Sequence, residues 1–125
     1  MTNEEKDLLL KDLCARLPYG VVCYNSNTES NFKLCDVADI DSGYPTFDYG
    51  YGKLENVKPY LRPMESMTEE EKIEWDAEYA YNSHTYSYEE YLARMLDWLN
   101  KKKFDYRGLI SIGLALEAPE GMYND

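Results

Sequence analysis

The sequence is poor in the residues that most often carry enzyme chemistry. It has one histidine, His84, and three cysteines, Cys14, Cys23 and Cys35, with no CxxC pair. A lone histidine in a polar stretch is usually a solvated side chain, and scattered cysteines in odd number indicate buried free thiols. Neither GxGxxG nor GxxxxGK[ST], the spacings that cradle phosphate groups, occurs. We therefore predict no catalytic residue and no cofactor.

Two acidic patterns that could suggest a metal fail on spacing. Asp39-x-Asp41-x-Gly43 begins like a calcium loop, but glycine stands where the loop needs a third oxygen ligand. Glu71 and Glu74 form an ExxE pair, whereas a di-metal helix bundle needs ExxH on paired helices. An Asx-stabilised turn and a solvated acidic helix face explain these residues better, so we predict no metal ligand.

Long apolar runs are absent as well. No stretch approaches the roughly 18 apolar residues of a membrane span. Residues 1–13 are acidic and amphipathic, unlike the positively charged start of a secretory signal. These absences and the scattered cysteines favour a cytoplasmic protein without membrane contact. A chain of 125 residues with 44% hydrophobic residues can bury a core, and we expect one domain over residues 1–125.

Positive charge is scarce, and the acidic excess is concentrated in one segment. The chain carries 24 acidic and 13 basic residues, a net charge of -11. Residues 65–91 contain nine acids and one base, Lys72, for a net of -8, whereas residues 1–64 have a net of -3 and residues 92–125 are balanced. Such a local field repels nucleic acid and anionic membranes and attracts basic partners.

The order of periodicities is helical, then alternating, then helical, which predicts the α+β class. We expect an N-terminal helix from Asn3, a small antiparallel sheet of three or four strands, and two C-terminal helices packed on one face. Capping boxes mark the helix starts and pair Thr2 with Glu5, Thr68 with Glu71 and Ser87 with Glu90. The expected strands lie at residues 20–24, 31–38, 46–49 and 53–61, with Pro59 ending the last.

Residues 87–119 show the strongest helical pattern, and we expect the fold to be organised around them. Their apolar side chains recur at spacings of three and four. In the preceding helix, Ile73, Ala77 and Ala80 form the expected apolar face. The predicted core joins the two ends of the stretch: Leu92, Met95, Leu96 and Leu99 with Leu109, Leu114 and Leu116.

Tyrosine is abundant, and many tyrosines flank the acidic segment. The chain has 13 tyrosines. Tyrosine offers a large contact area at low entropic cost, which is typical of adaptable binding surfaces, although about half of such rings are expected to serve the core. Glutamates also recur every four residues, a like-charge column that a helix does not need for stability. The predicted protein-binding residues are Glu70, Glu74, Glu78, Tyr79, Tyr81 and Tyr86.

Two segments resemble small uncharacterised proteins of gut Bacteroidota and their phages. They are VKPYLRPMESMTEEE, Val57–Glu71, and FDYRGLISIGLALEAPEGMY, Phe104–Tyr123, which together cover about a third of the chain. The resemblance implies an origin in a bacterial cytoplasm or a mobile element. It implies no activity, cofactor or site residue.

Three function classes compete on these observations. The first is a non-catalytic adaptor or inhibitor that binds a basic protein partner through residues 65–91. The second is a nucleic-acid mimic that blocks a basic DNA-binding protein, and the third is a small enzyme without a recognisable motif. Missing site chemistry and the charge asymmetry favour the first class, and no direct nucleic-acid binding is expected.

Overall fold

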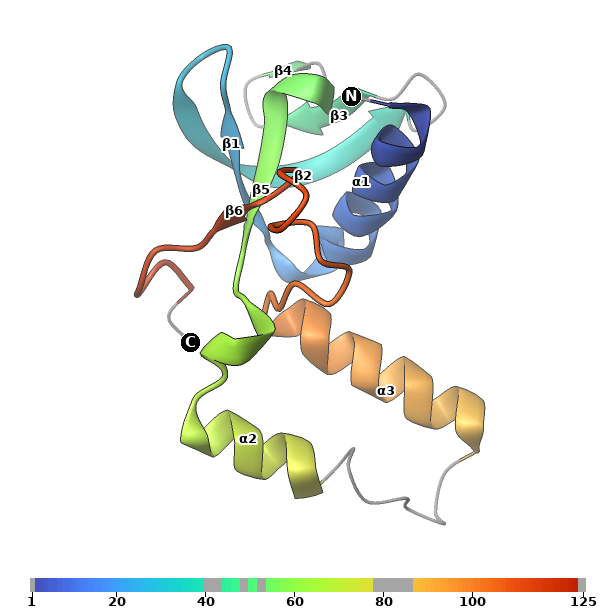
Figure 1. Ribbon diagram of the computed structural model, residues 1–125. Coiled ribbons are helices and arrows are strands. Elements are labelled where there is room, and N and C mark those ends of the chain that lie inside the picture. The colour runs from blue at the N-terminus through green and yellow to red at the C-terminus, as the bar shows by residue number, and fades with distance from the viewer. Residues whose placement is uncertain (1, 40–43, 48–49, 52–53, 78–86, 124–125) are drawn as a thin grey trace.

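The computed structural model describes residues 2–39, 44–47, 50–51, 54–77 and 87–123 (Figure 1). Within them an N-terminal helix is followed by strands, then by two further helices and a last short strand. The α+β class predicted from the order of periodicities is therefore confirmed.

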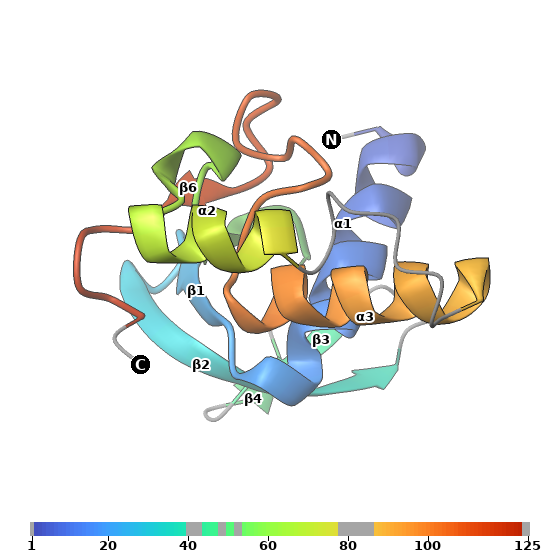
Figure 2. The same ribbon diagram turned by 90° about the horizontal axis from the view of Figure 1, so that it is seen from below.

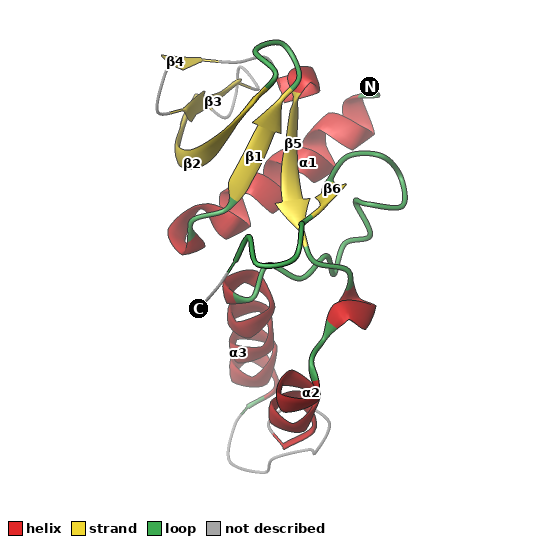
Figure 3. Cartoon of the chain, turned by 90° about the vertical axis from the view of Figure 1, so that its left-hand side faces the viewer, coloured by secondary structure: helices red, strands yellow, loops and turns green. Residues whose placement is uncertain are grey.

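A six-stranded mixed sheet has the strand order β4-β3-β2-β1-β5-β6 (Figure 3). Neighbouring strands are antiparallel except β5 and β6, which are parallel. The sheet is larger than the three or four antiparallel strands expected, because the short strand β4 pairs with β3 at one edge and the C-terminal part of the chain returns to pair with β5 at the other. The strands are β1 (Val22–Asn25), β2 (Ser30–Asp39), β3 (Tyr44–Phe47), β4 (Gly50–Tyr51), β5 (Val57–Leu61) and β6 (Leu116–Glu117).

The predicted hairpin is confirmed as β1 and β2. Val22 pairs with Lys33 at one end, and Asn25 pairs with Ser30 at the turn. The Asn25 side chain accepts a hydrogen bond from the backbone N–H of Asn27 at 2.9 Å, so the turn is stabilised by an Asx contact.

The strand predicted at residues 46–49 corresponds to β3, and the last predicted strand, β5, does not end at Pro59. It continues to Leu61, and Pro59 lies opposite Cys23 of β1. The Pro59 ring is buried on the same side as Val57 and Leu61. On its other side β5 pairs with β6 only at Tyr60 and Leu61, so proline is accommodated just before the paired stretch.

All three predicted helix starts are confirmed. Thr68 is the N-cap of α2, and its hydroxyl accepts from the Glu71 N–H at 3.1 Å while the Glu71 carboxylate accepts from the Thr68 N–H at 2.9 Å. Thr2 and Glu5 form the same reciprocal pair. The helices are α1 (Asn3–Arg16), α2 (Glu69–Trp75) and α3 (Tyr88–Lys101), and short 3₁₀ turns are η1 (Leu17–Tyr19), η2 (Leu54–Asn56) and η3 (Met64–Ser66).

The main core lies between α1, the sheet and the segment 109–115. Leu9 and Leu13 of α1 are fully buried against the sheet. Figure 1 shows α1 beside the sheet and α2 and α3 beyond one end of it, so that in the view from below α2 and α3 stand in front of the strands (Figure 2). The remaining buried members are Val21, Cys23, Phe32, Leu34, Leu54, Val57, Leu61, Leu109, Leu114 and Ala115.

Helix α3 belongs to a second, aromatic cluster, so the predicted core is only partly right. Trp98, Leu99 and Phe104 are buried together, with Met95 packed against them. Leu109 and Leu114 are buried, but in the main core, and Leu116 is half-buried. Leu96, predicted to be buried, is 40% exposed. The helical spacing was read correctly, but the covered face is narrower than the apolar stripe, and Leu96 lies at its edge.

Candidate protein-interaction surface

The inner side of α2 is fastened to the end of β5 by an ion pair. Arg62 donates to the Glu71 carboxylate through Nη1 at 2.8 Å and through Nη2 at 2.6 Å. The Arg62 guanidinium also lies 4.3 Å from the centre of the Phe104 ring. The hydrogen bonds from Arg62 lower the pKa of Glu71 to about 2. Glu71 therefore serves to hold α2 in place, and its charge is already paired with Arg62 and not available to a partner.

A second contact fastens α2 to α3. The Trp98 indole N–H donates to Glu74 Oε1 at 2.8 Å, and the Trp75 and Trp98 ring centres are 5.5 Å apart. Glu74 remains exposed but has a fixed position. The predicted acidic edge is therefore not simply solvated, since one of its members anchors the helix.

The outer side of α2 carries an apolar side chain in acidic surroundings. Ile73 is 68% exposed, so its predicted place on the core-facing side is wrong. Ile73 follows Glu71 by two positions and therefore points to the opposite side of the helix. The exposed acidic residues around it lie at the neighbouring helical positions, three or four residues away. We call Glu69, Glu70, Ile73 and Asp76 the α2 outer surface.

Only part of the predicted binding site lies in the described residues. Glu70 and Glu74 are four positions apart along α2 and both are exposed. The only base within the helix, Lys72, contacts Glu69 at 3.5 Å in a pair that is itself exposed. Such surface pairs are weak, so Lys72 offsets little of the local field. The other predicted residues, Glu78, Tyr79, Tyr81 and Tyr86, and the lone His84 lie outside the described residues.

A groove with a volume of about 820 Å³ runs beside the start of α2. Its lining comes mainly from two segments that are distant in the sequence, and we call these segments its two walls. The first wall contains residues between Arg62 and Glu71, the second contains residues 117–121 with Tyr123, and Lys102 also lines the groove. Sequence reasoning missed the second wall, because residues 117–121 have neither a charge run nor a motif. The sequence signal was limited to two acids, Glu117 and Glu120, flanking Pro119.

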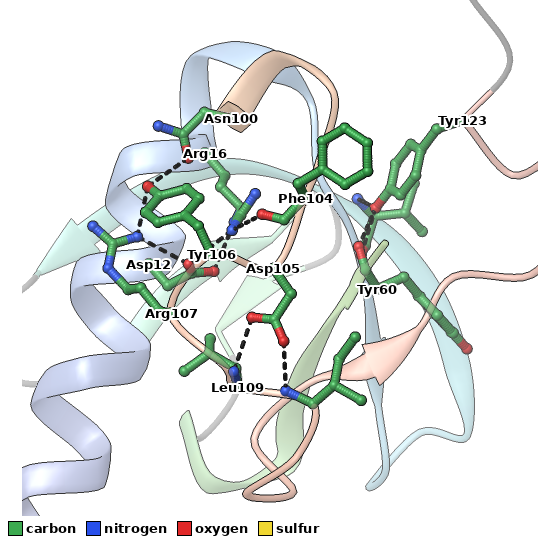
Figure 4. Close-up of polar contacts among 12 residues, drawn as sticks. Asp12, Arg16, Tyr60, Asn100, Phe104, Asp105, Tyr106, Arg107, Leu109 and Tyr123 are labelled. Atoms are coloured by element: carbon green, nitrogen blue, oxygen red, sulfur yellow. Dashed lines mark hydrogen bonds and ion pairs between the residues drawn. The ribbon is translucent and has the colours of Figure 1, made fainter. Parts of the chain in front are cut away.

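A buried ionic network also escaped the sequence analysis (Figure 4). Asp12 and Arg16 of α1 are fully buried and form an ion pair at 2.8 Å. Arg107 joins them with a 3.0 Å contact to Asp12, and Tyr106 accepts from Arg107 at 2.8 Å and donates to Asn100 at 2.9 Å. The only signal was the i,i+4 spacing of an acid and a base on an otherwise apolar helix face.

The network fastens α1 to the chain after α3. Arg16 Nη2 donates to the Phe104 carbonyl at 2.7 Å, and the neighbouring Asp105 accepts from the N–H groups of Leu109 and Ile110 at 2.8 and 3.0 Å (Figure 4). Arg16 Nη1 is buried and has no hydrogen-bond partner among the residues that the structure describes. Because its charged groups are turned inward and paired, we assign this network to stability.

The described part of the chain offers no other recognisable centre. Within it no three His, Cys, Asp or Glu side chains converge to hold a metal ion, and no helix is long and apolar enough to cross a membrane. Burial raises the pKa of the Cys23 thiol, which disfavours a reactive thiolate. Comparisons with protein-family models, curated proteins and solved structures find no match. Function is therefore inferred from surface chemistry alone.

Proposed function

We propose that this chain is a non-catalytic adaptor or inhibitor that binds a basic protein partner through the α2 outer surface. The observation that carries the proposal is Ile73, 68% exposed in the middle of an acidic helix. An apolar side chain surrounded by charges matches the usual anatomy of an interface, with an apolar centre and a polar rim. Binding to Ile73 should cost little conformational entropy, because a capped helix already holds this residue in position.

Charge and contact have separate tasks in this proposal. The acids of the α2 outer surface, together with Glu74 and the predicted site residue Glu78, attract the basic partner over distance and set the association rate. Ile73, with predicted help from Tyr81 and Tyr86, supplies short-range contact and sets the dissociation rate. A nucleic-acid mimic needs rows of carboxylates at phosphate-like spacing and has no use for an apolar centre. The exposed isoleucine therefore favours a protein interface over mimicry of a phosphate backbone.

The test is retention of partners by the immobilised full chain, at low and at moderate salt. Because of the resemblance stated above, the source is a bacterial lysate. The charge variant replaces Glu70, Glu74 and Glu78 with Gln, and we expect it to lose a protein that the wild type retains. The matched control removes the same charge elsewhere on the surface, through Glu4→Gln, Asp7→Asn and Glu55→Gln, and should retain that protein.

A second variant separates contact from charge. Ile73→Ala keeps the net charge and favours helix formation, so the fold is expected to persist. With the retained protein in hand, we expect Ile73→Ala to speed dissociation with little effect on association. The triple Gln variant should instead slow association and flatten its salt dependence. If the triple Gln variant and its control retain the same proteins at both salts, the acidic face is only solvated and the proposal fails.

A further inference from the structure

The groove beside α2 has a charge balance that selects its ligand. Four carboxylates line it, those of Glu70, Glu71, Glu117 and Glu120. Two cations also line it, Arg62 and Lys102, which leaves two negative charges in excess.

The acidic character of the groove is stronger than this count suggests, because one of the two cations is already paired. Both Nη groups of Arg62 are bonded to Glu71, so that pair is neutralised internally. Glu70 lies on one wall, and Glu117 and Glu120 lie on the other. All three are exposed, and none forms an ion pair with a described residue. The acids left for a ligand therefore come from two segments of the groove lining that are distant in the sequence.

We propose that this groove receives an extended, arginine- or lysine-bearing segment of the basic partner. The inference rests on the proposed function and locates where the partner's chain continues beyond the α2 outer surface. Glu70 belongs to both surfaces, so the groove adjoins the face that carries Ile73. Each groove wall spans several residues, which suits an extended chain better than a compact ligand. A basic side chain between the walls satisfies carboxylates from both.

The apolar part of the lining supports a peptide more than a free cation. Ala118 and Pro119 lie between the two acids of the second wall in the sequence, and Tyr123 also lines the groove. The Tyr123 hydroxyl accepts from the Val22 N–H at 2.9 Å and donates to the Tyr60 carbonyl at 2.7 Å, so this ring is fixed against the sheet (Figure 4). The aliphatic stem of a lysine or arginine can lie against such a wall while its head reaches the carboxylates.

The test uses a capped tetra-arginine peptide and, as a neutral isosteric control, capped tetra-citrulline. Backbone amide shifts of the ¹⁵N-labelled full chain are followed during titration. We expect shifts at Ser66, Glu120 and Gly121 with the arginine peptide only. Replacing Glu117 and Glu120 with Gln should raise the dissociation constant at least tenfold. The control pair Glu4→Gln and Asp7→Asn, which removes equal charge from α1, should change it less than twofold.

The outcomes separate this inference from the proposed function. Shifts confined to Ile73 and Asp76 overturn the groove and leave the α2 outer surface standing. Shifts spread over the acidic surface, with both variant pairs weakened equally, show charge attraction alone and overturn the groove as well. The groove proposal is also overturned if the citrulline peptide binds as tightly as the arginine peptide, or if neither peptide binds. Should the double variant fail to fold by circular dichroism, Glu117→Gln and Glu120→Gln are tested singly.

Discussion

Charged residues serve opposite purposes in the two parts of this molecule. In the body, formed by α1, the sheet and residues 109–115, Asp12 and Arg16 are fully buried and bonded to each other. In the arm, formed by η3, α2 and α3, most acids face water, and the buried cluster is small and aromatic. Charged residues thus stabilise the interior of the body, whereas in the arm they give the surface a negative electrostatic potential.

The comparison shows where a change of charge affects folding and where it affects binding. Removing a buried partner leaves an uncompensated ion in the interior, which destabilises strongly. Removing an exposed acid changes the surface field with little effect on stability. Glu71 is the exception in the arm, because its ion pair with Arg62 is largely buried. The predictions below test this division.

The largest effect is expected in the body. Asp12→Ala leaves Arg16 buried without its ion pair and deprives Arg107 of its contact. We expect a loss of about 3–5 kcal/mol in the free energy of unfolding, measured in urea. Asp7→Ala, on the exposed side of the same helix, is the control and should change stability by less than about 0.5 kcal/mol. Similar small losses for both variants would show that the buried charge of Asp12 contributes no more to stability than an exposed one.

Two leucines of α3 sharpen the comparison within the arm. Leu99 is buried beside Trp98 and Phe104, whereas Leu96 is 40% exposed. Leu99→Ala should cost about 2–5 kcal/mol, and Leu96→Ala less than about 1 kcal/mol. Urea unfolding of the two variants measures the difference. If Leu96→Ala proves the more costly, the covered face of α3 has been misplaced.

The sequence carried local information well. Capping boxes located the helix starts because a cap depends on residues three positions apart, Thr68 and Glu71 for example. Alternation and turn residues located the β1–β2 hairpin for the same reason. The sequence did not predict pairing between segments that are distant along the chain. The apolar run that ends at Leu116 does not identify β5 as the strand with which Leu116 and Glu117 pair, because this pairing depends on a return of the chain from α3.

Burial was the second limit. An apolar stripe shows which side of a helix can be covered, but the neighbours decide how much of it is covered, as at Leu96. The prediction for Ile73 was wrong for a related reason. Helix α2 is held to Arg62 by Glu71 and to Trp98 of α3 by Glu74 and Trp75, rather than by its aliphatic residue. In the candidate site, the acidic segment was visible in the sequence, whereas the groove required two distant segments to meet.

A pH titration tests the largely buried ion pair between Glu71 and Arg62. The pKa of Glu71 is lowered from 4.5 to about 2 by hydrogen bonds from Arg62. The folded state therefore binds this proton less readily than the unfolded state, so the contribution is present above about pH 4.5 and is lost as the pH falls toward 2. We expect a loss of about 1–3 kcal/mol across this window.

The control for this titration is Glu71→Gln, which cannot ionise. The variant should be less stable than the wild type at pH 7, and the gap should narrow as the pH approaches 2. Stability is followed by urea unfolding at each pH, and other carboxyl groups contribute equally to both proteins. A constant gap from pH 7 to pH 2 would show that the ion pair with Arg62 does not govern the difference.

The smallest expected effect concerns Glu74, where fastening and surface charge meet. Its carboxylate accepts a hydrogen bond from the Trp98 indole at 2.8 Å, and its position on α2 is exposed. Glu74→Gln keeps an oxygen acceptor there and should change stability by less than about 0.5 kcal/mol, whereas Glu74→Ala removes the acceptor and should cost about 1 kcal/mol. Urea unfolding gives the two values, and tryptophan fluorescence reports the surroundings of the contacting pair Trp75 and Trp98.

The two substitutions also decide how the binding test is interpreted. If Glu74→Gln leaves stability and tryptophan fluorescence unchanged, a loss of partner by the triple Gln variant reflects the missing charge. If Glu74→Gln destabilises as much as Glu74→Ala, the carboxylate itself holds α2 against α3. Glu74 would then serve to hold α2 and α3 together, and Glu70 and Ile73 would remain as the residues to test for partner binding.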